Sequence, residues 1–405
     1  MDVLYTHCCG LDVHKKNVVA CALTPEGKEI RTFSTMTEDL IALGDWLKAK
    51  GCTHVAMEST ASYWKPIYNL LELEGFHVMV LNAKHIKNVP GRKTDVKDAE
   101  WIAGLLQHGL LQGSYIPNRE QRELRELIRY RRSMIDERAR EINRIQKVLE
   151  GANIKLSSVT TDILGKSGRT MIEAMIQGQE NPQALSELAK GKLKSKKTDL
   201  QKAMHGFMGD HQKLMLETQL RHIDFLDEII AKLDEEVKAR MLPFEEDLEL
   251  LDTIPGVGRR TAEQILAEAG TDMNQFPSAA HLCSWAGVAP GSNESAGKRK
   301  SGKAKKGNQK LRSALVEAAR AASRTKDTYL ASQYHRIAAR RGANRAALAV
   351  AHSILTIVYH ILKRRQPYIE LGANYYEERK RQIVVKQSIK KLEVLGYKVT
   401  VEEVA

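Results

Sequence analysis

The sequence contains little cysteine, and its few cysteines form no recognisable redox or metal-binding pattern. Only five of the 405 residues are cysteine, and no two of them make a Cys-x-x-Cys pair. Because the number is odd, any disulfide scheme leaves one thiol unpaired, which argues against a disulfide-built secreted fold. We expect reduced thiols, mostly buried in strands, in a cytoplasmic protein.

Signals for export or membrane insertion are also lacking. The charged residues near the N-terminus follow the apolar run instead of preceding it, which is not the order of a signal peptide. The longest uncharged stretch, residues 346–362, contains several polar side chains and is marginal for crossing a bilayer. It favours a packed core helix, so we expect no membrane partner.

What the sequence does contain is a surplus of positive charge. The 63 Lys and Arg residues exceed the 50 Asp and Glu residues, which gives a net charge of +13. A hydrophobic content of 42% and a charged content of 28% fit a soluble globular chain of about two to four domains. Such a charge indicates a polyanionic partner. Because membrane signals are lacking, that partner is nucleic acid.

Residues 1–115 alternate between strand-like and helix-like segments. Three successive strands joined by turns, followed by strands that alternate with helices, predict a mixed sheet covered by helices. This order matches an RNase H-like arrangement, a fold that hosts many nucleases and integrases. The expected strands are residues 8–13, 17–23, 30–34, 54–57 and 77–81, and the expected helices are 38–48, 64–73 and 94–106.

Residues 116–247 show two heptad series. They predict an antiparallel hairpin or a coiled-coil dimer, and two long helices within one bundle fit them equally well. Arg131 and Arg138 occupy positions on the seam between the two predicted helices, which argues against a long, purely apolar coiled-coil interface. The two series are Ile128, Ile135, Ile142 and Leu149, and Leu216, Ile223, Ile230 and Val237.

Residues 248–375 are predicted to form an all-helical region, and residues 376–405 a charged tail. The segment 251–258 ends in Pro-Gly-Val-Gly before an apolar helix, like a helix-hairpin-helix. Gly256 and Gly258 would let backbone N–H groups approach a phosphate at the helix N-terminus. Ordinary turn chemistry also explains a Pro-Gly connection between two helices.

Four acids in the first region have the placement of a metal site. Asp12 lies within the first strand, Glu58 ends the fourth, and Asp95 and Asp98 share one face of the following helix. Clustered carboxylates repel one another unless a cation offsets them, and hard oxygen ligands suit Mg²⁺, with Mn²⁺ as the alternative. Taken singly, Asp98 can pair with a neighbouring lysine and Asp95 can stabilise a helix start. Asp12, between Leu11 and Val13 in a core strand, is costly without a partner or metal.

A second cluster is basic. Eight Lys and Arg residues and no acid occupy residues 298–312, a composition suited to phosphate backbone contact. Within or just before this segment lie Ser292, Ser295 and Ser301. One of these serines could act as a nucleophile, or all of them could simply cap turns in a DNA-binding loop. The expected nucleic-acid contacts here are Lys298, Arg299, Lys300, Lys303, Lys305, Lys306, Asn308 and Arg312.

Several segments together resemble one known family. In chain order they are Asp12, Glu58, residues 92–99, 254–258, 285–291, 294–298 and 306–312. The sequence is similar to the insertion-sequence transposases of family one hundred and ten, and the resemblance extends over nearly the whole chain to about residue 372. It implies an N-terminal RuvC-like domain with a DEDD catalytic set, and a C-terminal transposase domain.

The resemblance also implies a mechanism and partners. A structured non-coding bridge RNA would direct the enzyme to donor and target DNA, and Asp12, Glu58, Asp95 and Asp98 would hold Mg²⁺. Ser295 would attack DNA and form a covalent phosphoserine link, with Ser292 as its rival. The RuvC-like domain of one subunit would work with the transposase domain of another, in a dimer or tetramer.

Two other functions remain open from the residues themselves. A RuvC-like nuclease would cut DNA with metal-activated water and use Ser295 only as a phosphate contact. A non-catalytic nucleic-acid-binding or assembly protein would need the positive charge but not the acids. The prediction is therefore a site-specific DNA recombinase, with these two alternatives.

Overall fold

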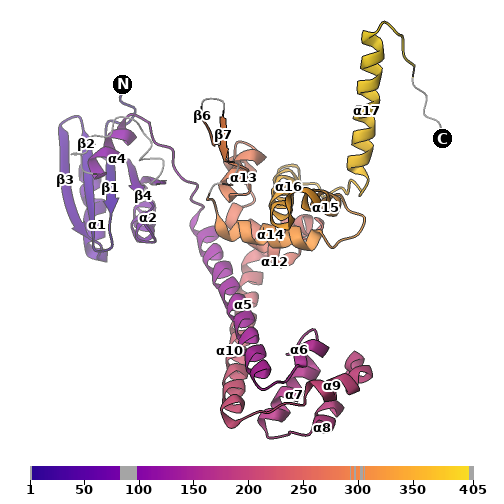
Figure 1. Ribbon diagram of the computed structural model, residues 1–405. Coiled ribbons are helices and arrows are strands. Elements are labelled where there is room, and N and C mark those ends of the chain that lie inside the picture. The colour runs from indigo at the N-terminus through magenta and orange to yellow at the C-terminus, as the bar shows by residue number, and fades with distance from the viewer. Residues whose placement is uncertain are drawn as a thin grey trace. The chain divides into compact units, whose positions relative to one another are not determined.

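We examined a computed structural model, which describes residues 2–82, 98–291, 293–295, 298–301, 304 and 306–400. The chain divides into two compact units, Met1–Arg119 and Glu120–Ala405 (Figure 1). The first is a mixed α/β unit, as the sequence predicts, and the second is mostly helical. Asp95, Ser292, Lys303 and Lys305 lie outside the described residues.

The first unit is built on a five-stranded sheet with the strand order β3-β2-β1-β4-β5. β1 pairs antiparallel with β2, and β2 with β3, whereas β1 and β5 each run parallel to β4. The first and fourth strands, which carry Asp12 and Glu58, are therefore neighbours in the sheet. The strands are β1 (Cys8–Val13), β2 (Asn17–Thr24), β3 (Gly27–Ser34), β4 (His54–Glu58) and β5 (His77–Leu81).

Helices cover the two faces of this sheet. Because side chains alternate across a strand, Cys9 and Leu11 of β1 face one core with α1 (Thr37–Ala49) and α2 (Trp64–Leu73). Cys8 and Ala56 face the other side, where they pack with apolar residues of α4 (Asp98–Gln107). The unit is therefore a three-layer sandwich, with α4 alone covering its side among the described helices.

The second unit begins with two long helices, α5 (Arg119–Gly151) and α10 (Asp210–Met241). Ion pairs fix their direction: Glu123 meets Arg240 at 3.2 Å, whereas Arg138 meets Asp227 at 2.5 Å. As numbers rise along α5 they fall along α10, so the heptads form an antiparallel hairpin within one chain. The predicted seam is only partly apolar, because Arg131 is buried within it.

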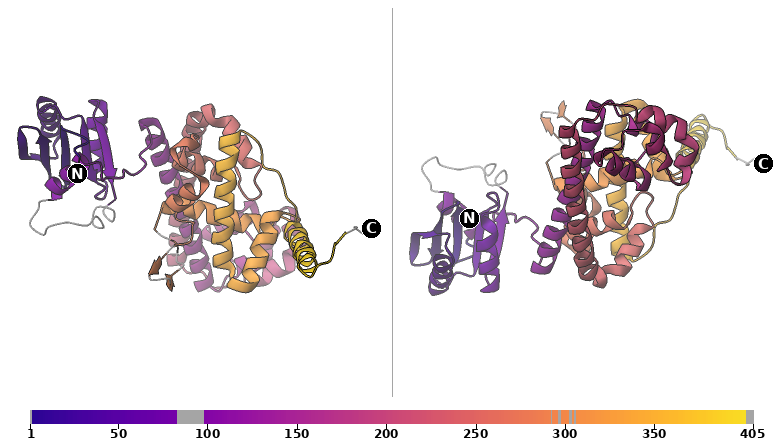
Figure 2. Two further views of the ribbon diagram at one scale, coloured as in Figure 1. Left: turned by 90° about the horizontal axis from the view of Figure 1, so that it is seen from above. Right: turned by 90° about the horizontal axis from the view of Figure 1, so that it is seen from below.

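A small helical module joins the far ends of α5 and α10. Its helices pack around a separate apolar core that includes Ile145, Met171 and Leu216. In the view from below in Figure 2 this module lies in front of the long helices. It consists of α6 (Leu156–Val159), α7 (Lys166–Ile176), α8 (Pro182–Glu187), η1 (Gly191–Lys196) and α9 (Lys197–Ala203).

Most of the remaining helices pack around α16 (Ala343–Arg364). Within the described part of the chain, α16 alone is long and apolar enough to cross a membrane. More than half of its most apolar stretch is buried inside the protein, however. The prediction of a packed core helix is thus confirmed. Its neighbours are α11 (Glu245–Asp252), α13 (Ala279–Ala286), α14 (Gln309–Ala322) and α15 (Tyr329–Arg341), joined by η2 (Leu242–Phe244), α12 (Arg259–Ala269) and η3 (Met273–Gln275).

One prediction for this region needs correction. The region is not all-helical, because β6 (Asn293–Ser295) and β7 (Lys298–Ser301) form an antiparallel hairpin where a loop was expected. Backbone hydrogen bonds between the two strands define this hairpin, and the side-chain composition of the segment does not record them. The charged tail, whose secondary structure the sequence left open, contains the exposed helix α17 (Tyr375–Val394).

Candidate functional site

Asp12 and Glu58 occupy equivalent places on two neighbouring parallel strands. The last pair in register between β1 and β4 is Leu11 with Met57, so the next residue of each strand is one of the acids. Neighbouring strands lie about 4.8 Å apart. Alternation puts both carboxylates on the side of the sheet that carries α4, because Cys8 and Ala56 face that helix. The fold thus sets two acids side by side at one edge.

α4 comes unusually close to β1 because Gly10 has no side chain. A Cβ on Gly10 would stand 2.3 Å from the backbone nitrogen of Ala103 and from the backbone oxygen of Ala99. Cys8 Sγ donates to the Ala103 carbonyl at 3.8 Å. Proceeding from Cys8 to Asp12 along β1 therefore leads towards the N-terminal end of α4, where Asp98 is the first residue.

The donor set suits a hard divalent cation, but the described residues contain only part of it. Asp12 is about a quarter exposed and its Oδ2 lies 3.1 Å from Nε2 of His14. No group of three or more His, Cys, Asp or Glu side chains in the described ranges is arranged to hold a metal ion. Asp12 and Glu58 fit as two carboxylate ligands of such a cation. Asp98 does not lie close enough to them to form a group of three ligands, and Asp95 is outside the described ranges.

The predicted serine lies at a defined place in the second unit. Ser295 is the last residue of β6 and is paired in register with Lys298, the first residue of β7. Glu294 is paired with Arg299, and an irregularity shifts the register towards Asn293. The basic residues 298–300 therefore belong to a strand that runs beside the serine, and not to a disconnected loop.

The root of the hairpin is closed by a tight contact between two of the segments that carry the family resemblance. A Cβ on Gly307 would stand 2.4 Å from the nitrogen of Gly287, and the nitrogen of Asn308 donates to the carbonyl of Trp285 at 3.0 Å. Gly287 ends α13 in the left-handed conformation with φ 73°. The segments before and after the hairpin are therefore held together by the contact between residues 285–287 and 307–308.

Asn308 connects this root to the long helix α5. Its Nδ2 donates to Oε2 of Glu268 at 2.7 Å, and its Oδ1 caps α14 by accepting from Leu311. Glu268 is 1% exposed and also accepts from Arg129 at 2.6 and 2.7 Å. The predicted nucleic-acid contact Asn308 therefore has both ends of its amide engaged within the protein. Sequence reasoning missed Glu268, whose partners lie 40 and 139 positions away.

The two glycines of the 251–258 segment have different surroundings. Gly256 has φ +85°, and a Cβ there would stand 2.4 Å from the carbonyl oxygen of Ala318 in α14. Gly258 precedes α12 and has open space around it. Gly256 is needed for helix packing, whereas Gly258 leaves the start of α12 accessible to a ligand.

Cysteine chemistry is excluded as the source of a nucleophile. All five cysteines are buried and free. Burial raises the pKa of Cys8 to about 12 and the pKa values of Cys21 and Cys52 to about 11. These thiols stay protonated at neutral pH, as expected for buried reduced cysteines.

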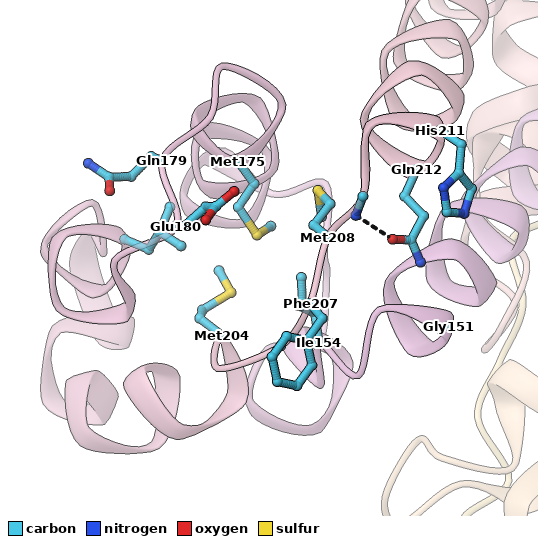
Figure 3. Close-up of a pocket in the computed structure, with 13 residues that line it drawn as sticks. Gly151, Ile154, Met175, Gln179, Glu180, Met204, Phe207, Met208, His211 and Gln212 are labelled. Carbon is cyan, nitrogen blue, oxygen red and sulfur yellow. Dashed lines mark hydrogen bonds between the residues drawn. The ribbon is translucent and has the colours of Figure 1, made fainter.

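A cavity of about 650 Å³ lies in the helical module, apart from every predicted site residue. Figure 3 shows Met175, Met204 and Met208 around it, with Gln212 accepting from the nitrogen of Gly209 at 2.8 Å. Its rim includes Glu180 and the exposed ring of Phe207. It lacks the converging acids or bases that phosphodiester chemistry requires, so it is not the candidate site.

Known protein families match both of the regions that carry these features. Residues 9–154 match the DEDD transposase model of IS110 elements, described as a transposase. Residues 248–336 match the model described as the transposase IS116/IS110/IS902 family. The chain belongs to the IS110 family of transposases. Asp12 and Glu58 fall in the first match, and Ser295 falls in the second.

Relatives extend over almost the whole of this transposase. It is 26% identical over 364 residues to the transposase for insertion sequence element IS1111A of Coxiella burnetii, covering 89% of this chain and 90% of that protein. It is 22% identical over 375 residues to the pilin gene-inverting protein of Moraxella lacunata, covering 89% and 96%. An IS110 element protein of Streptomyces coelicolor is 27% identical over 384 residues, covering 87% and 93%.

Family membership establishes the general chemistry. A transposase binds DNA and transfers its strands, which is recombination in the broad sense. The DEDD transposase domain also implies dependence on a divalent metal ion. The charge surplus and the paired acids of β1 and β4 agree with both properties.

Proposed function

We propose that this IS110-family transposase is a site-specific recombinase that cuts and exchanges DNA strands through carboxylate-bound metal and a serine nucleophile. The observation that carries the proposal is the equivalent placement of Asp12 and Glu58 at adjoining ends of β1 and β4. The first unit would be RNase H-like, with the RuvC-like arrangement of its catalytic acids. Residues 1–115, 116–247, 248–375 and 376–405 would be its functional regions.

In this proposal Asp12, Glu58, Asp95 and Asp98 hold Mg²⁺ or Mn²⁺, which supplies charge stabilisation for the scissile phosphate when bound. The chain's own contribution is to keep the carboxylates close despite their repulsion. β1 and β4 fix two of them in register, and Gly10 brings the N-terminal end of α4 onto the same side. Asp98 stands at that end.

Ser295 is the proposed nucleophile, and Ser292 is its rival. The Ser295 hydroxyl loses its proton as Oγ bonds to phosphorus, while the bond from phosphorus to a deoxyribose oxygen breaks and that oxygen gains a proton. A hydroxyl of the incoming strand then displaces the serine, so the phosphodiester count is conserved and no water is consumed. The backbone pairing of Ser295 with Lys298 supports this role, because a lysine cation offsets negative charge that develops on a phosphate.

A structured non-coding RNA is the proposed guide, and its loops would pair with donor and target DNA. This part rests on the resemblance in the sequence and on the net charge of +13, because sequence readout by RNA needs only backbone contacts from the protein. The proposed nucleic-acid contacts are Lys298, Arg299, Lys300, Lys303, Lys305, Lys306 and Arg312, the cap residue Asn308, and the helix-hairpin-helix-like Gly256 and Gly258. A cytoplasmic homo-oligomer, dimer or tetramer, is the proposed working form.

Denaturing electrophoresis of products from a labelled DNA substrate tests the nucleophile. Wild type should leave a protein–DNA adduct, and Ser295→Ala should abolish it while DNA binding survives. Ser157→Ala, which alters an exposed serine of α6, is the matched control and should leave the adduct intact. An adduct that persists in Ser295→Ala would falsify the assignment, and cleaved DNA free of protein would instead support water attack by a nuclease.

The acids and the guide need separate tests. Asp12→Asn and Glu58→Gln should abolish adduct formation and lower Mn²⁺ affinity, which titration calorimetry measures without any DNA. Full recombination by both variants in cells would favour a non-catalytic assembly protein. For the guide, changing one loop of the co-expressed RNA should redirect recombination to the matching DNA, and unchanged targeting would contradict RNA guidance.

A further inference from the structure

A second basic surface, outside the segment predicted to bind nucleic acid, surrounds the turn between α15 and α16. Residues 328–369 contain no Asp or Glu. Arg340 and Arg341 end α15, Gly342 forms the turn, and Arg345 lies in the first turn of α16. Arg320 of α14 reaches the same turn, where its Nη2 donates to Oδ1 of Asn344 at 3.3 Å. We call Arg320, Arg340, Arg341 and Arg345 the Gly342 arginine cluster.

The cluster is unlike the arginines of the long helices. Arg131 and Arg138 of α5 and Arg240 of α10 each meet a carboxylate at 2.5–2.9 Å. None of the four cluster arginines forms an ion pair with a carboxylate of the described residues, although all are exposed. Four neighbouring cations without an internal counter-charge repel one another, and a bound polyanion removes that repulsion.

A purely structural explanation accounts for only part of the cluster. Cations in the last turn of a helix are stabilised by its dipole, which suits Arg320, Arg340 and Arg341. Arg345 is in the opposite situation, because it stands in the first turn of α16, at the positive end of that dipole. The same helix start has no acidic residue in its first turn and no side-chain cap. Helix stability therefore does not explain Arg345.

The exposed face of α14 links the cluster to the serine hairpin. Lys310, Ser313, Glu317, Arg320 and, just beyond the helix, Arg324 recur at helical spacing and are all exposed. The acid among them, Glu317, is held by Arg132 at 2.6 and 2.8 Å, so its charge is offset. The face is consequently positive from one end of α14 to the other.

The distance along α14 from the hairpin root to the arginine cluster can be compared with the spacing of phosphates along a nucleic-acid duplex. From Gln309, beside the hairpin root, to Arg320 the helix rises by about 17 Å at 1.5 Å per residue. Phosphates of one DNA strand repeat about every 3.4 Å along the axis, so this distance corresponds to roughly five base pairs. A duplex held at the hairpin can thus continue along α14 to the cluster.

We propose that the Gly342 arginine cluster and the exposed face of α14 form a second contact surface for the phosphate backbone of duplex DNA. The surface lengthens the contact between the protein and DNA bound at the hairpin, and it helps to position that DNA. DNA is the partner because the family binds it and because the spacing fits a continuous duplex. The inference requires DNA binding only, and it stands or falls independently of the Ser295 reaction.

Fluorescence anisotropy of the full chain with a blunt duplex of about 30 base pairs, across a salt series, tests the surface. The test variant is Arg340→Gln/Arg341→Gln/Arg345→Gln. The matched control is Arg140→Gln/Arg144→Gln/Arg221→Gln, which removes the same charge from exposed arginines that have carboxylate partners. A second variant, with lysine at positions 340, 341 and 345, retains the charge, and thermal melting verifies that each variant folds.

The test variant should bind duplex DNA roughly 10- to 100-fold more weakly at 0.1 M salt and lose about three units of salt slope. The lysine variant and the control should keep the wild-type slope. Equal losses in the test variant and the control would overturn the proposal, since net charge would then explain them. A loss confined to duplex RNA of the same sequence would also overturn it, because the surface would belong to RNA. Adduct formation at saturating DNA, measured in parallel, reports separately on Ser295.

Discussion

Asn308 holds Glu268 and the first turn of α14 with the two ends of a single side-chain amide. Nδ2 donates to Glu268 at 2.7 Å, and Oδ1 accepts from the nitrogen of Leu311 at 3.2 Å. Because Glu268 is almost fully buried and also binds Arg129, one amide joins the hairpin root to α5. The segment that carries Ser295 is thereby fastened to the longest helices of the unit.

Asn308→Asp should separate the two functions of this side chain. The carboxylate still caps α14, but it cannot donate to Glu268 and places a second negative charge beside it. We expect a loss of about 2 kcal/mol in the free energy of unfolding, measured by urea denaturation, and slower adduct formation at saturating DNA. Gln309→Ala, at the exposed neighbouring position, should change neither. Wild-type stability in Asn308→Asp would mean that capping alone matters.

Gly10→Ala should displace α4 from the sheet. The new methyl group would meet backbone atoms of Ala99 and Ala103 at 2.3 Å, which side-chain rotation cannot relieve. We expect a loss of about 1–3 kcal/mol in stability and weaker Mn²⁺ binding, because Asp98 moves with the helix. The measurements are urea denaturation and calorimetric titration with Mn²⁺.

Gly104→Ala provides the control for the same helix. No atom lies within 4 Å of a Cβ at this position, so the substitution adds helix propensity without a clash. It should stabilise α4 by about 0.5–1 kcal/mol and leave metal affinity unchanged. Equal behaviour of the two alanine variants would refute the close approach of α4 to β1.

Arg131→Met should destabilise the second unit, and the matching change of its partner should restore much of the loss. Arg131 is 4% exposed and donates to Glu263 at 2.7 Å and to Asp234 at 2.9 Å. Its removal leaves Glu263 buried with weakened compensation, at a cost of about 3 kcal/mol. In Arg131→Met/Glu263→Leu that buried charge is absent. Urea denaturation compares the variants, and an equal loss in single and double variants would contradict this coupling.

Thiol labelling should show that the cysteines of the first unit are inert in the folded protein. Burial raises the pKa of Cys52 to about 11, whereas an unfolded cysteine ionises near about 8.5. At pH 8.5 the reactive thiolate is therefore depleted by roughly 100-fold, and mass spectrometry should find slow iodoacetamide labelling unless urea is present. A native cysteine that labels as fast as in urea would contradict this.

The same shift has a defined effect on stability. Since the unfolded thiols lose their protons first, the free energy of unfolding of the first unit should fall as the pH rises from about 8.5 towards the folded pKa. Below the unfolded pKa both states are protonated, so no change is expected there from the thiols. A Cys52→Ala variant, examined by urea denaturation across this range, should show a smaller decline than wild type.

The repeating patterns of the sequence predicted much of the fold. The strand-like runs placed Asp12 within the first strand and Glu58 at the end of the fourth, and the heptad positions marked α5 and α10. These features depend on neighbours along the chain, which sequence spacing records directly. Heptads alone did not distinguish a hairpin in one chain from a dimer, because both bury the same stripe.

Contacts between distant segments were not predictable in this way. Nothing in the sequence of residues 298–301 distinguishes a strand from a basic loop, and the pairing partner of Ser295 became evident only in the hairpin. The acid–arginine pairs of Glu268 and Glu263 join helices more than a hundred positions apart. Charged residues carry no periodic signal that identifies such partners.

The sequence by itself determined the class of this protein: its motif order, its positive charge and its acids indicate a DNA-acting transposase. Only the tertiary structure decided that α4 packs closely against Gly10 on the face that carries the acids, and that Asn308 anchors the hairpin root. It also decided that the arginines around Gly342 have no carboxylate partner among the described residues. The physical reason is that composition fixes how much charge a chain has, whereas packing fixes which charges are neutralised and which remain for a partner.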